Sequence, residues 1–157
     1  MSHIDISALL SAARTRAQVP ARSRKRALEL AAELLTADSS GMTTGTLFEH
    51  LLTRERLGST GLGEGIAIPH CRVDCPRPMA ALLRLETPVD FDAPDDAPVD
   101  LLFVLIVPPG ETSAHLTTLA ALARLFQSAD NRAALRAGAS DAELYDTFIS
   151  LVRTGST

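Results

Sequence analysis

Residues 61–71 read Gly-Leu-Gly-Glu-Gly-Ile-Ala-Ile-Pro-His-Cys, and the prediction of both fold and function starts from this stretch. Its three glycines alternate with other residues and give the backbone unusual freedom. The short apolar run 66–68 follows and predicts a buried strand. Pro69 then restricts the chain, so that His70 is held at the end of that strand. A flexible loop, a buried strand and a rigidly presented imidazole together indicate a reaction site.

The composition limits the class of protein. The chain has 157 residues, of which 46% are apolar and 22% are charged, and this predicts one globular domain over residues 1–157. A formal net charge of −4 argues against nucleic acid as the main partner. The sequence contains no run of about 18 apolar residues, so it predicts no membrane span, and residues 1–5 do not resemble the start of a secretory signal. We therefore expect a cytoplasmic protein.

The hydrophobic pattern predicts one α/β domain, with helices on both faces of a mixed sheet. Apolar residues at helical spacing predict helices over 23–35, 44–54 and 113–126. A short helix over 131–136 follows, and a capping box of Ser140 and Glu143 opens a last helix that runs to about residue 152. Apolar runs predict strands over 66–68, 80–85 and 101–107, while residues 4–10 fit either a helical turn or an edge strand.

Two histidines and an arginine are candidates for a shared site. His70 and His115 each follow an apolar strand, and ligands bind at strand ends in α/β sheets. His115 begins the helix 113–126, where the positive helix end disfavours an imidazolium and keeps the ring neutral. Arg54 lies shortly before the glycine loop and presents a bidentate fork suited to phosphate. On spacing alone, each of these residues also fits a purely structural role.

The glycine loop is a candidate phosphate-binding segment, although it matches no dinucleotide or P-loop motif. Its spacing is Gly-x-Gly-x-Gly, it precedes a strand, and it lacks the Gly-Lys-Ser/Thr end of a P-loop. Gly61, Gly63 and Gly65 can still turn successive N–H groups inward as an anion nest. Thr60 adds a hydroxyl beside them.

The sequence predicts neither a metal site nor a bound cofactor. The acidic run 90–100 fails the calcium-loop pattern, because Pro94 and Asp95 stand where an oxygen ligand and a glycine are needed. Cys71 and Cys75 have no second Cys/His pair at zinc spacing. Cys71 lies beside His70 and could be sensitive to oxidation, but a role as a plain small residue is favoured.

These residues also carry a family resemblance. Residues 57–70, Leu-Gly-Ser-Thr-Gly-Leu-Gly-Glu-Gly-Ile-Ala-Ile-Pro-His, closely resemble the active-site segment of enzyme IIA domains of the phosphoenolpyruvate-dependent phosphotransferase system, of the fructose/mannitol/nitrogen-regulatory type. The resemblance continues through 85–93, 98–103 and 115–119 and so covers essentially the whole chain. It implies the mannitol-type enzyme IIA fold, which has three layers and a mixed sheet of about five strands. The chain departs from the pattern at Cys71, where a glycine usually follows the histidine.

The resemblance implies that His70 accepts a phosphoryl group from a histidine phosphocarrier protein, with His115 and Arg54 beside that group. No metal or cofactor is implied, and the chain would be a phosphohistidine carrier rather than a stand-alone turnover enzyme. The lone domain and the Gly-Ser-Thr-Gly-Leu-Gly sequence favour a nitrogen-regulatory phospho-switch that acts on regulated target proteins. Two alternatives stay open, a sugar-specific enzyme IIA that passes phosphate to an enzyme IIB and a catalytically silent docking module. A hydrolase using the two histidines has no base–nucleophile pair to support it.

Overall fold

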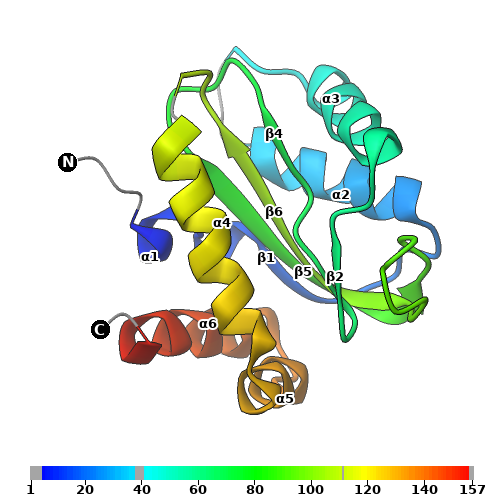
Figure 1. The fold of residues 1–157 in the computed structure, drawn as a ribbon, viewed down its shortest axis with the longest axis vertical. Coiled ribbons are helices and arrows are strands. Elements are labelled where there is room, and N and C mark those ends of the chain that lie inside the picture. The colour runs from blue at the N-terminus through cyan, green and yellow to red at the C-terminus, as the bar shows by residue number, and fades with distance from the viewer. Residues whose placement is uncertain (1–4, 38–40, 111, 156–157) are drawn as a thin grey trace.

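The computed structural model describes residues 5–37, 41–110 and 112–155 (Figure 1). Its helices are α1 (Ile6–Leu9), the 3-10 turn η1 (Ala12–Arg14), α2 (Arg24–Thr36), α3 (Thr44–Leu57), α4 (Thr112–Gln127), α5 (Ala129–Ala137) and α6 (Asp141–Gly155). Its strands are β1 (Thr15–Val19), β2 (Gly61–Gly63), β3 (Ile66–Ala67), β4 (His70–Arg72), β5 (Met79–Val89) and β6 (Val99–Val107). Among these described residues, none of the helices is both long enough and apolar enough to cross a membrane.

The sheet is mixed, as predicted, and has six strands. The strand order is β1-β5-β6-β3-β2, and β4 pairs with β6 beyond the end of β3. Strand β5 runs antiparallel to β6, whereas β1 pairs parallel with β5, and β3 and β4 both pair parallel with β6. The strands β3 and β4 therefore lie one after the other along the same side of β6, with the predicted reaction site at the second of them.

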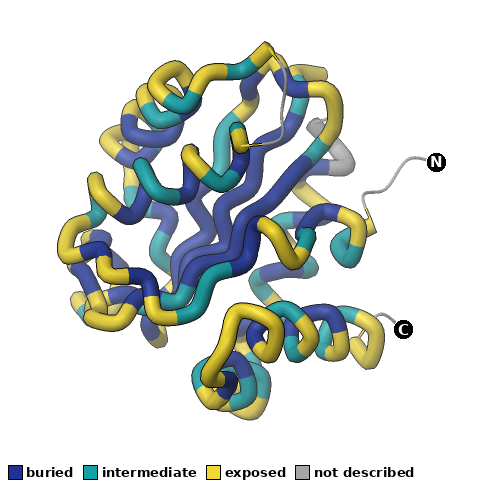
Figure 2. The backbone as a smooth tube through the Cα atoms, turned by 180° about the vertical axis from the view of Figure 1, so that it is seen from behind, coloured by how far each residue is buried: buried dark blue, intermediate teal, exposed yellow. Residues whose placement is uncertain are grey.

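Helices cover both faces of the sheet, which confirms the three-layer prediction (Figure 1). Alternate residues of β6 enter two separate cores, because successive side chains of a strand point to opposite faces. Leu102, Val104 and Ile106 pack in the core that holds α2 and α3. The intervening β6 residues pack in the core formed with α1, α4, α5 and α6. Figure 2 shows the central strands as a continuous buried band.

Side-chain caps determine where several helices begin. The hydroxyl oxygens of Ser23, Thr43 and Ser128 each accept a hydrogen bond from a backbone N–H three residues later, which satisfies one free donor of α2, α3 and α5. The predicted capping serine, Ser140, does the same for Glu143 at the start of α6, at 3.1 Å. Residues 4–10, which were open to two interpretations, contain the short helix α1 after its cap residue Asp5.

The glycine-rich stretch is a β-hairpin and not an irregular loop. Strands β2 and β3 pair antiparallel, with Gly61 beside Ala67 and Gly63 beside Ile66. The turn places Gly63, Glu64 and Gly65 at φ values of 89°, 58° and 80°, in the left-handed region that glycine tolerates best. The alternating glycines therefore allow a tight turn between β2 and β3.

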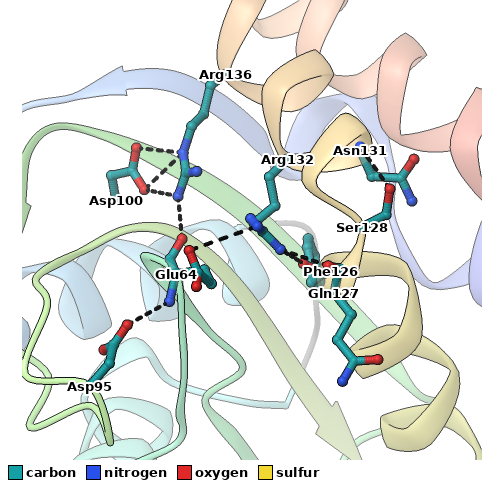
Figure 3. A network of polar contacts seen from close by, with 9 residues as sticks. All are labelled: Glu64, Asp95, Asp100, Phe126, Gln127, Ser128, Asn131, Arg132 and Arg136. Atoms are coloured by element: carbon teal, nitrogen blue, oxygen red, sulfur yellow. Dashed lines mark hydrogen bonds and ion pairs between the residues drawn. The ribbon is translucent and has the colours of Figure 1, made fainter.

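A network of charged side chains holds the hairpin turn against α5 (Figure 3). Arg136 Nη2 donates to Asp100 Oδ1 at 2.8 Å and to the Glu64 carbonyl at 2.7 Å. On the other side of the turn, the Glu64 N–H donates to Asp95 Oδ2 at 2.9 Å. This bond, together with a second one from the Ala97 N–H, lowers the pKa of Asp95, because both favour its ionised form. Asp95 lies between β5 and β6 and Asp100 near the start of β6, so both of these carboxylates of the acidic run 90–100 hold the hairpin in place.

The network makes Gly65 a sharper test of the fold than other glycines. A Cβ at Gly65 would meet the Arg136 guanidinium and would lie 2.9 Å from Asp100 Oδ1, whereas a Cβ at Gly110 (φ 100°) would meet nothing within 4 Å. Both Gly→Ala changes force an L-residue to positive φ, but only Gly65→Ala also displaces the ion pair. We expect Gly65→Ala to lower the free energy of unfolding by roughly 1–3 kcal/mol more than Gly110→Ala, measured by urea denaturation. Equal losses would contradict this account of the hairpin.

Candidate functional site

His70 is the first residue of β4, at the edge of the sheet. It lies beside Leu105 of β6, and the Leu105 N–H donates to the Pro69 carbonyl at 2.9 Å. Because paired residues of neighbouring strands point to the same face, His70 faces the core that contains Leu105 and α4. The half-buried ring brings Nδ1 to 2.7 Å from the Ile68 carbonyl oxygen. A carbonyl oxygen only accepts, so Nδ1 carries the proton and the lone pair of neutral His70 is on Nε2.

His115, in the first turn of α4, lies against His70 as predicted from the strand ends. The two ring centroids are 5.4 Å apart and the ring planes are tilted by 51°. His115 is buried, and its Nδ1 has no hydrogen-bond partner among the described residues. The site therefore contains the half-buried imidazole of His70 and, in contact with it, the buried imidazole of His115, whose Nδ1 makes no hydrogen bond among the described residues.

Burial keeps both imidazoles neutral near pH 7. Desolvation lowers the pKa of His70; the bond to Ile68 opposes this, and the positive charge of Arg54 lowers the pKa further. Desolvation also lowers the pKa of His115, followed by the charges of His70 and Arg72. Neutral His70 keeps a lone pair available for attack on an electrophile.

Arg54 reaches the site from the last turn of α3, which packs against β4. Its Nη1 donates to the Gly58 carbonyl at 2.9 Å and so holds the guanidinium at the C-terminal end of the helix. A shallow groove beside it is lined by α3 side chains, including Leu57, and by Cys71 of β4. The structure thus places the rings of His70 and His115 against each other, and it brings the charge of Arg54 near enough to His70 to lower the pKa of that ring.

The glycines of the predicted phosphate-binding loop do not join this group. Ile66 lies beside Leu101 and His70 beside Leu105, so the hairpin turn is about 13 Å along the sheet from the imidazole. Gly63 and Gly65 form that turn, and the Glu64 N–H between them is bonded to an aspartate. The Gly61 N–H donates to Ser59 Oγ at 3.0 Å. We therefore assign these glycines to the hairpin rather than to a nest around the imidazole.

Thr60 lies nearer to His70, but its donors are already used. Its hydroxyl donates to Glu55 Oε1 at 2.7 Å and its N–H donates to Glu55 Oε2 at 3.0 Å. Its carbonyl accepts from the Ile68 N–H at 3.1 Å. Thr60 therefore connects α3 to the residue whose carbonyl holds the His70 ring.

Two charged residues near the site were missed by the sequence interpretation. Glu55 lies just beyond the helix predicted over 44–54, yet it belongs to α3 and is only 3% exposed, and its spacing of four from Leu51 puts it on the buried stripe of that helix. Arg72 is two residues after His70 on β4, so strand alternation puts both side chains on one face. For Glu55 the signal was present in the sequence as helical periodicity, whereas Arg72 could be placed only once β4 was known.

Cys71 points to the other face of β4, where it packs against the core of α2 and α3. Burial raises the pKa of its thiol to about 12, with a further increase from Cys75 and a decrease from Arg54. The thiol is therefore protonated at pH 7 and is a poor nucleophile. This is consistent with the favoured interpretation of Cys71 as a small packing residue.

Comparison with known proteins agrees with the resemblance seen in the motif. The profile of the family described as "Phosphoenolpyruvate-dependent sugar phosphotransferase system, EIIA 2" matches residues 8–150. A nitrogen regulatory protein from Pseudomonas aeruginosa is 45% identical over 149 residues, which cover 94% of this chain and 97% of that protein.

Solved structures support the same assignment. The crystal structure of the nitrogen regulatory protein IIA-Ntr from Neisseria meningitidis superposes with a TM-score of 0.82 and 39% identity, covering 90% of this chain and 97% of that one. The fold is also shared with the mannitol IIA of Escherichia coli, at a TM-score of 0.69 and 22% identity, covering 86% and 92%. This chain belongs to the EIIA 2 family of the phosphotransferase system and resembles its nitrogen regulatory members.

Proposed function

We propose that this protein is a phosphoryl carrier that accepts a phosphoryl group on Nε2 of His70 and acts as a regulatory switch. The observation that carries the proposal is the 2.7 Å contact between His70 Nδ1 and the Ile68 carbonyl. This contact uses one ring nitrogen as a donor and leaves the lone pair of the other for phosphorus. The donor that fits this chemistry is a phosphohistidine of a phosphocarrier protein, and the proposal includes a cytoplasmic location for the transfer.

The transfer is an in-line displacement between two imidazoles. The Nε2 lone pair of His70 forms the new N–P bond, and the electron pair of the donor's N–P bond returns to the donor ring. Because the two bonds are of one kind, the reaction is near balance, and the protein contributes position and charge rather than driving force. The charge of Arg54, which already acts on His70, and the ring of His115, which lies against that of His70, stabilise the negative phosphoryl oxygens. No step of this reaction requires a metal.

The favoured role is regulatory, with phosphorylated and unphosphorylated forms binding target proteins differently. The likeness to nitrogen regulatory proteins from two organisms supports this role. A sugar-specific role, in which an enzyme IIB receives the phosphoryl group, uses the same site chemistry and differs only in the acceptor. Affinity capture with and without phosphorylation separates the two roles, because only the regulatory role needs a target whose binding changes with phosphate.

The site assignment is tested by phosphorylation. Incubation with phosphoenolpyruvate, enzyme I and a histidine phosphocarrier protein should add the mass of one phosphoryl group, which acid treatment should remove. His70→Ala should gain no mass, because it lacks the nucleophile. His50→Ala, which removes an exposed histidine of α3, should be labelled like the wild type. Labelling of His70→Ala would refute the site, and a folded wild-type protein that is never labelled would favour the docking-module alternative.

The pH dependence tests the role of Arg54. Since only neutral His70 attacks, the rate of phosphoryl transfer should fall as the pH drops through the pKa of His70, which lies below the ordinary 6.5. The positive charge of Arg54 lowers that pKa, so Arg54→Gln should move the midpoint of the rate profile to higher pH. It should also slow transfer at high pH, by roughly 10- to 1,000-fold, because a phosphate-binding cation is lost. Arg56→Gln, at an exposed neighbour on the same helix, should do neither.

A further inference from the structure

Glu55 is a buried carboxylate at a position where helical periodicity places an apolar residue. It is 3% exposed and follows Leu47, Leu51 and Leu52 on the buried stripe of α3. Both of its oxygens accept hydrogen bonds, and both bonds come from Thr60. Removing a carboxylate from water is costly, and a buried charge is weak evidence for stability. The burial of Glu55 is therefore better explained by the groups that its carboxylate holds in place than by a gain in stability.

Three successive hydrogen-bonded links lead from Glu55 to the reacting imidazole. The carboxylate fixes the N–H and hydroxyl of Thr60, at 3.0 and 2.7 Å. The Thr60 carbonyl accepts from the Ile68 N–H at 3.1 Å. The Ile68 carbonyl then accepts from His70 Nδ1 at 2.7 Å. The end of α3 is thus connected to the atom that determines which nitrogen of His70 is free.

Glu55 also contributes a charge. Among the described residues, the charges that shift the pKa of His70 are those of Arg54 and Glu55 of α3. The ring of His115 of α4 lies against His70, and Arg72 of β4 shifts the pKa of His115. Two adjacent residues of α3 therefore act on the same ring with opposite sign. The negative charge of Glu55 favours the imidazolium and so partly offsets the effects of Arg54 and burial.

We infer that Glu55 is a positioning residue for His70: through Thr60 and the Ile68 carbonyl it holds the ring with Nδ1 protonated and Nε2 free. The inference rests on the proposed function only in making Nε2 the atom that receives the phosphoryl group. Glu55 does not touch the phosphoryl group itself. Its shape sets the orientation and tautomer of the ring, and its negative charge adds a smaller effect that favours the imidazolium.

Two substitutions separate the effect of shape from that of charge. Glu55→Gln can still accept from the Thr60 N–H and, with its amide, donate to the Thr60 hydroxyl, so it keeps the links and loses the charge. Glu55→Leu fits the apolar stripe of the helix and loses the links as well. Glu86→Gln is the matched control, because it removes an exposed carboxylate of β5 that contacts none of these groups.

The measurement is the 15N spectrum of the imidazole rings in the unphosphorylated protein across a pH titration. The wild type and Glu86→Gln should show the Nδ1–H tautomer of His70. Glu55→Gln should keep this tautomer but titrate at lower pH. Glu55→Leu should populate the Nε2–H tautomer of His70. In the phosphoryl transfer assay, at a pH where His70 is fully neutral, it should react roughly 10- to 100-fold more slowly, because the nucleophile is misplaced.

The inference is overturned if folded Glu55→Leu, checked by its amide spectrum, keeps the Nδ1–H tautomer. If Glu55→Leu does not fold, the test uses Thr60→Val, which removes only the hydroxyl link to Glu55. An unchanged His70 tautomer in Thr60→Val also overturns the inference, whereas a shift toward the Nε2–H tautomer supports it. The spectra need no phosphoryl donor. A wild-type protein that is never phosphorylated would therefore refute the proposed function and leave the test of Glu55 intact.

Discussion

The chemistry of this site depends on one hydrogen bond, between His70 Nδ1 and the carbonyl of Ile68 two residues earlier. Neutral imidazole has one donor and one acceptor nitrogen, so a carbonyl held at one nitrogen assigns the lone pair to the other. Pro69 and the pairing of β4 with β6 hold the two residues in the geometry that the bond needs. The hairpin before them, its ion-pair network and the link through Thr60 all support the backbone on which this bond forms.

The surroundings of the ring support the proposed phosphoryl transfer. Burial and neighbouring positive charge keep both histidines neutral, and the adjacent thiol is protonated at pH 7 because burial raises its pKa to about 12. Within the described part of the chain, no cluster of residues suited to binding a metal ion is present. What the site offers is a positioned lone pair with Arg54 and His115 beside it, which suits transfer between two bonds of similar energy.

The sequence predicted much of the fold, because apolar periodicity reports local structure. The helices and the central strands β5 and β6 lie where that periodicity placed them, within a few residues. The second strand of the hairpin, β3, lies where the apolar run 66–68 predicted it, but β2 was missed because glycines have no side chains to alternate. Strand β4 was missed because a strand of three residues with two polar members has no apolar pattern. His70 and His115 were paired correctly from strand ends. The long-range contacts of Glu55 and Gly65 arise from tertiary packing, which periodicity alone does not reveal.

The most direct test of this account is the identity of the phosphorylated atom. Protein labelled with 15N in its histidines would be phosphorylated by the phosphocarrier pathway, and the coupling between phosphorus and the ring nitrogens would be measured by NMR. We expect a single phosphohistidine, at His70, with phosphorus on Nε2 and the proton retained on Nδ1. Phosphorus on Nδ1 of His70, or on another residue, would contradict the central claim that the Ile68 carbonyl selects the reacting nitrogen.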